Sequence, residues 1–241
     1  LHSTSRRQRQ MCIRDSKDCE DAALVVVAIG EARKPGQTRL DMLGRSVEML
    51  KELLEQLKPY KIPGIVVTIT NPADIVADYV RKGLGLERNR VFGTGTLLDT
   101  ARLIRTLSEE SGVGRRSIQA YSLGEHGDSS MIPFSSVTIG GLPFDAYDIS
   151  KEKVLEATRQ IGMTIIEGKK STEFGIGRAL TEIAACILRD EKKIMPASVL
   201  LQGEYGQHDV HCGVPCLIGK NGIEKIIELP LTEEEPVSYT H

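Results

Sequence analysis

Strand-like and helix-like segments alternate along the first 93 residues, and this alternation is the strongest constraint on the fold. Runs of β-branched and other apolar residues occupy 24–29, 65–70 and 91–92. A helical pattern from 41 to 58 separates the first two runs, and a second one follows Pro72. Strands joined by helices of this kind pair in parallel and are covered by those helices. The sequence therefore predicts an α/β fold with a parallel sheet.

The remainder of the chain has a different pattern. Helical periodicity is present at 97–110, 151–167 and 172–189, and strand-like sequence extends from 197 to 229. Apolar residues recur on one face of the second of these helices, as in helices that pack on a core or on another subunit. Long helices followed by a block of strands indicate a second region that is built differently from the first.

The composition excludes several classes of partner. The chain has 31 basic and 33 acidic residues and a formal charge of −2, so we expect neither a nucleic-acid nor a membrane partner. No apolar run approaches the roughly 20 residues that span a bilayer. The five cysteines lack the paired spacing of a secreted scaffold. They indicate a reducing compartment, and we expect a cytoplasmic protein.

A single histidine lies in the segment Gly124-Glu125-His126-Gly127-Asp128, directly after the apolar run 118–123. A histidine on a tight turn at the end of a strand can face a substrate and exchange its proton. Its pKa lies near neutral pH, and a nearby carboxylate raises that pKa and selects the protonated ring nitrogen. The alternative is a structural histidine whose nitrogens are both satisfied.

Asp99 and Arg102 lie three residues apart in the helical pattern at 97–110 and therefore share one helical face. The aspartate can pair with His126, and the arginine can hold a carboxylate through two parallel N–H···O bonds. One rigid helix would then supply both groups. The alternative is an intrahelical ion pair on the solvent-exposed surface.

Two further segments follow strand-like runs. The segment 30–39 has a glycine at its start, a second glycine and a proline inside it, and three cations, which is the composition of a mobile lid over an anionic ligand. The alternative is a solvated basic loop. Asn71 follows the run 65–69, where an amide points into the ligand crevice of an open α/β sheet. It is equally suited to cap the next helix, with Pro72 in the first turn.

Potential metal ligands are concentrated near the end of the chain, at His208, His211, Cys212 and Cys216. Their spacing is not that of a zinc finger, and they alternate along strand-like sequence. Residues 211–218 are predicted to form one strand, so His211 and Cys212 should face opposite sides. We therefore expect no metal site.

Four separated motifs, GEARKPGQTRLD, TNPADI, GTGTLLDTAR and GEHGDS, resemble the NAD-dependent L-lactate and malate dehydrogenases. The resemblance extends from about residue 18 to about residue 235. It implies a partial Rossmann-type doubly wound parallel sheet in 17–93, as part of an NAD-binding domain. An α+β catalytic C-terminal domain would follow in 94–235. It also implies a homo-oligomer, a dimer or a tetramer.

The resemblance implies a role for each residue of the motifs. His126 would be the general acid/base, Asp99 its carboxylate partner, and Arg102 the group that grips the substrate carboxylate. Arg39, on the closing loop, would polarise the reacting C2 oxygen. A hydride would pass between C2 of an (S)-2-hydroxy acid and NAD, while His126 takes or gives the hydroxyl proton.

Other residues would line the pocket. By the same resemblance, Asn71 would hydrogen-bond near the reacting oxygen and the nicotinamide, and Thr172 would contact the substrate. Ile176 and Gly30 would contact the cofactor.

Substrate preference is predicted from Arg33. This loop position is an arginine in malate-preferring relatives and usually a glutamine in lactate-preferring ones, which places malate slightly ahead of lactate. An arginine enclosed beside a methyl group would also be a buried unpaired charge, which is costly. Two features favour lactate instead: the segments 37–41 and 124–129 resemble the lactate branch, and Glu31 is placed to neutralise Arg33.

The family's glycine-rich turn for the cofactor pyrophosphate is absent, because no G-x-G-x-x-G follows a strand in this sequence. The pattern begins just before the family's fourth strand, and 231–235 resembles the start of a final helix. We therefore expect a fragment truncated at both ends, which retains the chemistry and lacks the adenosine site. The alternative is a non-catalytic remnant, and we expect the fragment alone to be inactive.

Both ends of the chain depart from the family pattern. Residues 1–16 carry four arginines and no apolar stretch, and 236–241 show no pattern of their own. We expect both to be foreign to the gene. The alternative for 1–16 is an arm that binds nucleic acid.

Overall fold

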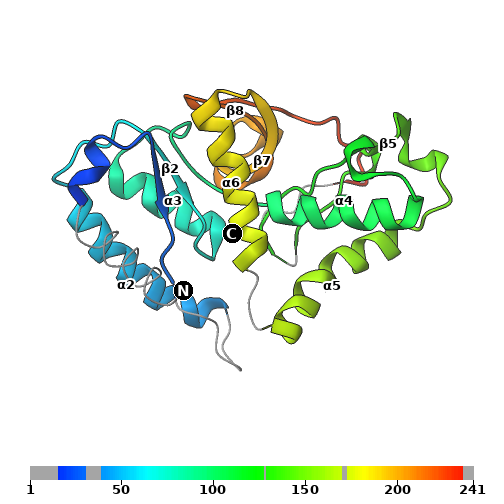
Figure 1. Ribbon diagram of the computed structural model, residues 1–241, viewed down its shortest axis with the longest axis horizontal. Helices are drawn as coiled ribbons and strands as arrows, with labels where there is room; N and C mark the ends of the chain where they lie inside the picture. The colour runs from blue at the N-terminus through cyan, green and yellow to red at the C-terminus, as the bar shows by residue number, and fades with distance from the viewer. Residues whose placement is uncertain (1–15, 31–38, 128, 170–172, 236–241) are drawn as a thin grey trace.

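The computed structural model describes residues 16–30, 39–127, 129–169 and 173–235, and within these the largest element is a six-stranded sheet (Figure 1). Its strands lie in the order β1-β2-β3-β7-β8-β9. Their bounds are β1 (Leu24–Val27), β2 (Ile65–Thr68), β3 (Val91–Gly93), β7 (Lys193–Gln202), β8 (His208–Gly219) and β9 (Gly222–Ile226). The first three strands pair in parallel, which confirms the predicted parallel sheet.

The sheet does not end with the parallel strands. β3 pairs with β7 in antiparallel orientation, with Gly93 opposite Ser198, and β7, β8 and β9 continue as an antiparallel ladder. The two regions that differ in the sequence therefore share one sheet. A second, small antiparallel sheet consists of β4 (Ile118–Gln119), β5 (Thr138–Ile139) and β6 (Leu142–Pro143).

The predicted helices are present. They are α2 (Arg39–Leu57), α3 (Ala73–Leu84), α4 (Leu97–Ser111), α5 (Lys151–Lys169) and α6 (Glu173–Arg189). Short 3-10 turns complete the described chain: η1 (Ser16–Glu20), η2 (Arg115–Ser117), η3 (Phe134–Ser136), η4 (Phe144–Ala146) and η5 (Glu204–Gly206). No helix in the described parts of the chain has the length and apolar character needed to cross a bilayer.

Strand β2 is buried on both faces, because helices cover both sides of the sheet. Val66 packs in a cluster with residues of α2 and α3, whereas Val67 packs with residues of α6. Both valines are fully buried. This arrangement explains why β2 has a continuous apolar sequence rather than an alternating one.

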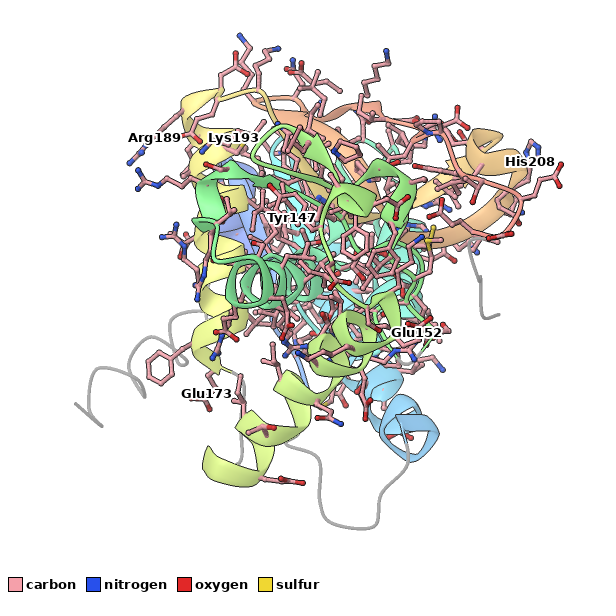
Figure 2. All side chains as sticks on the ribbon, turned by 90° about the vertical axis from the view of Figure 1, so that its right-hand side faces the viewer. Tyr147, Glu152, Glu173, Arg189, Lys193 and His208 are labelled. Atoms are coloured by element: carbon pink, nitrogen blue, oxygen red, sulfur yellow. The ribbon has the colours of Figure 1, made fainter. Side chains whose placement is uncertain are left out.

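The helices lie in two groups on either side of the molecule in Figure 1, with α6 between them. α2 and α3 lie beside the parallel strands, and α6 crosses in front of β7 and β8. α4 and α5 lie together on the other side and enclose a separate core with the small sheet. Figure 2 labels Glu173 and Arg189 at the two ends of α6, with Lys193 of β7 close to Arg189.

The apolar run 118–123 forms less strand than its sequence predicts. Only Ile118 and Gln119 belong to β4, and the chain then changes partners. Leu123 pairs with Met131, and the next residue, Gly124, pairs with Gly213 of β8. Because successive residues bond to different segments, no continuous ladder forms.

The Gly124–Gly213 pair ties the segment before His126 to the main sheet. Gly124 N–H donates to Gly213 O at 2.9 Å, and Gly213 N–H donates to Gly124 O at 2.7 Å. On the other side, Thr96 Oγ1 donates to Ser122 O at 2.5 Å. A Cβ atom at position 213 would press on the Thr96 hydroxyl, so glycine is required for this close approach.

We expect Gly213→Ala to destabilise the protein by about 1–3 kcal/mol, the usual cost of overpacking a filled site. The measurement is urea unfolding followed by circular dichroism. Gly114→Ala is the matched control, because a Cβ there meets no atom within 4 Å and should leave stability nearly unchanged. Equal stability of the two variants would contradict the close contact.

Candidate active site

His126 and Asp99 form a direct pair. Nδ1 of His126 lies 2.6 Å from Oδ2 of Asp99, and the two side chains are 23% and 15% exposed. Asp99 lies in the first turn of α4, and His126 follows the Gly124 bridge to β8. Because Nδ1 is occupied by the carboxylate, Nε2 is the ring nitrogen that is available to a ligand.

The surroundings of the pair determine its protonation. Burial by itself lowers the pKa of His126, but the charge and hydrogen bond of Asp99, with the charge of Asp74, outweigh this and raise the pKa. Burial by itself raises the pKa of Asp99, but His126 and Arg102 outweigh it and lower the pKa. The pair therefore favours imidazolium beside carboxylate.

Arg102 is held by the same carboxylate. Its Nη1 donates to Asp99 Oδ1 at 2.9 Å, and both side chains are only 15% exposed. The predicted helical neighbours thus do form an ion pair, but in a largely enclosed position rather than on the open surface. Gly162 of α5 lies against the guanidinium, because a Cβ there would be 3.3–3.4 Å from Nη1, Cζ and Nη2.

Gly30 and Asn71 lie at the carboxyl ends of two neighbouring strands. Ile29 N–H donates to Thr70 Oγ1 at 2.8 Å, which links the segments that follow β1 and β2. Both Gly30 and Asn71 are exposed. The N-cap position of α3 is Pro72 rather than Asn71, so the alternative role of Asn71 as helix cap is not observed.

Of the other predicted site residues, one lies on α6, one begins α2, and two lie outside the described residues. Ile176 is half-buried on α6 and packs against the central core. Arg33 and Thr172 lie outside the described residues. Arg39 begins α2, and its side chain is outside the described part.

The potential metal ligands of β8 face different surroundings. His211 lies against α3, with Nδ1 at 3.4 Å from Asp78 Oδ1, and burial lowers its pKa to about 4. Cys212 and Cys216 lie in the central core, where burial raises the pKa of both thiols. Among the described residues, no three His, Cys, Asp or Glu side chains are grouped so as to hold a metal ion.

Asp74 is a member of the site for which the sequence analysis assigned no role. Its Oδ2 accepts the main-chain N–H of His126 at 3.1 Å, and its Oδ1 accepts the Ser198 hydroxyl at 2.5 Å. Asp74 is part of the motif TNPADI. The motif draws attention to Asp74, but it does not predict the contact with His126. That contact joins residues 52 positions apart, so no local sequence pattern indicates it.

Sequence models of two adjoining domains match the chain. The model of the lactate/malate dehydrogenase NAD binding domain matches residues 2–93, and that of the lactate/malate dehydrogenase alpha/beta C-terminal domain matches residues 96–238. An L-lactate dehydrogenase 3 of Bacillus cereus is 42% identical over 228 residues, which cover 91% of this chain and 72% of the relative.

Solved structures agree with this assignment. The minor L-lactate dehydrogenase from Enterococcus mundtii has a TM-score of 0.87 and 35% identity, with 92% of this chain and 73% of that chain covered. The malate dehydrogenase from Aeropyrum pernix has a TM-score of 0.85 and 38% identity, with the same coverage.

These comparisons correct one prediction and confirm others. The curated relatives favour lactate, not the slight preference for malate that Arg33 suggested. The predicted fold class and NAD as the family's cofactor are confirmed. The predicted domain limits and the foreign character of both termini stay predictions. With both family domains matched in order and the expected fold present, the chain belongs to the lactate/malate dehydrogenase family of NAD-dependent oxidoreductases.

Proposed function

We propose that this protein is an L-lactate dehydrogenase, which interconverts (S)-lactate and pyruvate with NAD. The observation that carries the proposal is the 2.6 Å contact between His126 Nδ1 and Asp99 Oδ2, with Arg102 bound to the other oxygen of the same carboxylate. A proton donor and a carboxylate-binding group are thereby held in one fixed arrangement.

His126 exchanges the proton in this proposal. During reduction, imidazolium gives the Nε2 proton to the C2 oxygen as that oxygen gains negative charge. During oxidation, neutral imidazole takes the proton back from the hydroxyl group. Asp99 stabilises the imidazolium and orients the ring, as the carboxylate does in other histidine-carboxylate pairs.

The residues that follow the carboxyl ends of β1 and β2 suit a nicotinamide. Gly30 has no side chain and is exposed, and the exposed Asn71 amide follows the neighbouring strand. Ligands of open α/β sheets bind at this end of the strands. Ile176 adds an apolar contact in the proposal. When bound, NADH supplies the hydride that C2 of the oxo acid receives.

Three further residues act on the substrate. Arg102 binds the substrate carboxylate, for which the planar guanidinium is suited. Arg39 polarises the C2 oxygen, and Thr172 lines the substrate pocket. The roles of Arg39 and Thr172 rest on the family resemblance, because their side chains lie outside the described part of the chain.

Pyruvate is the proposed oxo acid because the relatives with this sequence pattern are named L-lactate dehydrogenases. The segments 37–41 and 124–129 also resemble the lactate branch. Oxaloacetate is the second candidate, and Arg33 specifically favours it. A cytoplasmic location stays a prediction from the cysteine usage, and a homo-oligomeric assembly stays a prediction from the family resemblance.

Steady-state NADH oxidation with pyruvate and with oxaloacetate tests the substrate. We expect a higher kcat/KM with pyruvate and little change in Arg33→Gln, because Glu31 neutralises Arg33 in this proposal. A preference for oxaloacetate that the variant shifts towards pyruvate would support the malate alternative.

Asp99→Asn tests the acid/base role through its pH dependence. Since Asp99 raises the pKa of His126, its loss lowers that pKa. Reduction needs imidazolium, so the rate of reduction falls as the pH rises. In the variant this fall should begin at a lower pH. At neutral pH we expect a loss in kcat of about 10²-fold or more. Asp145→Asn, an exposed control, should retain the wild-type profile, and an identical profile in Asp99→Asn would refute the proposed pair.

A further inference from the structure

We propose that Asp74 is a positioning residue for His126, a second carboxylate that holds the main chain of the histidine and adds negative charge beside its ring. The inference rests on the proposed function of His126 as the acid/base. It assigns a role to a polar contact that joins the helix after Asn71 to the loop carrying the histidine.

Asp74 bridges three elements. It lies in the first turn of α3, where its carboxylate accepts the His126 N–H at 3.1 Å and the Ser198 hydroxyl at 2.5 Å. Ser198 is fully buried on β7. The loop is therefore attached through Asp74 both to a helix and to the central strand that joins the two parts of the sheet.

The contact fixes His126 at a second point. Asp99 of α4 holds the ring at Nδ1, and Asp74 of α3 holds the main-chain N–H of the same residue. Two attachments from different helices limit both the position of the backbone and the rotation of the side chain. The direction of Nε2 is thereby determined, and proton transfer depends strongly on such alignment.

Asp74 also links the proton site to the expected cofactor site. It lies three residues after Asn71, so one short segment carries the exposed amide at the strand end and the carboxylate bound to the His126 loop. Any shift of this segment would move both groups together. The distance between the hydride donor and the proton donor would therefore be preserved.

The charges around the two residues support an electrostatic contribution. His126 is faced by Asp99 and Arg102 from α4 and by Asp74 from α3. Burial raises the pKa of Asp74, while its bonds from Ser198 and the His126 amide oppose that rise. The other ionisable neighbours of Asp74 are Glu125 in the loop and Cys212 of β8. Loss of the Asp74 charge should lower the pKa of His126.

Two substitutions separate positioning from charge. Asp74→Asn retains an oxygen that accepts the His126 N–H and removes the charge, whereas Ser198→Ala retains the charge and removes one attachment of the carboxylate. Asp78→Asn is the matched control, because Asp78 lies one turn further along α3 and pairs with Arg81 and Lys82 instead.

The experiment measures kcat and KM for pyruvate and NADH across pH in the full-length protein, together with the proton NMR titration of the His126 ring without cofactor. In Asp74→Asn we expect the ring to titrate at lower pH, and kcat for reduction to fall about tenfold with KM for NADH unchanged. Ser198→Ala should lose kcat by a smaller factor without a shift in titration. Asp78→Asn should match the wild type.

A folded Asp74→Asn protein with wild-type kcat and wild-type ring titration would overturn the inference, even if its melting temperature falls. Asp74→Asn keeps the shape and the acceptor, so the test does not depend on whether a truncating variant folds. Failure of the acid/base role that the proposed function gives to His126 is recognised separately. In that case His126→Gln would retain the activity with pyruvate, regardless of the result for Asp74→Asn.

Discussion

The site depends on one carboxylate that binds two cationic groups at once. Asp99 accepts from Arg102 with Oδ1 and contacts His126 with Oδ2. A buried carboxylate is costly unless its charge is compensated, and here both oxygens are engaged. Its position in the first turn of α4 adds the favourable field of the helix N-terminus. The His126 ring and the Arg102 guanidinium are therefore held by one side chain in the first turn of α4.

The sheet provides the second part of this support. Because β3 pairs with β7, the parallel strands and the antiparallel strands form one continuous surface. On that surface, Ser198 donates to Asp74 and Gly213 pairs with Gly124, so both strand residues are linked to the chain around His126. Position 213 requires glycine, because a Cβ there would press on Thr96. The loop that carries His126 is thus held by main-chain and hydroxyl contacts rather than by its own regular structure.

Local patterns in the sequence were sufficient for the helices, the parallel strands and the His126–Asp99 pair. The pair was found because each residue stands in a distinctive motif. The contact of Asp74 with His126 was not found, since a hydrogen bond between a side chain and a main-chain amide 52 residues away leaves no periodicity. The apolar run 118–123 forms a strand only at its first two residues, for a related reason. Its apolar residues face a core, but their backbone bonds go to several partners, and only the tertiary structure determines those.

In the proposed function, the balance of charge couples substrate binding to proton transfer. Asp99 and Asp74 favour the imidazolium form of His126, whereas Arg102 opposes it. A substrate carboxylate bound to Arg102 would offset part of that opposition, because it places a negative charge beside a cation that disfavours protonation. Binding of the oxo acid would therefore raise the proton affinity of His126 at the point where reduction needs the proton. The hydroxy acid carries the same carboxylate but also requires neutral imidazole, so oxidation would be favoured at higher pH.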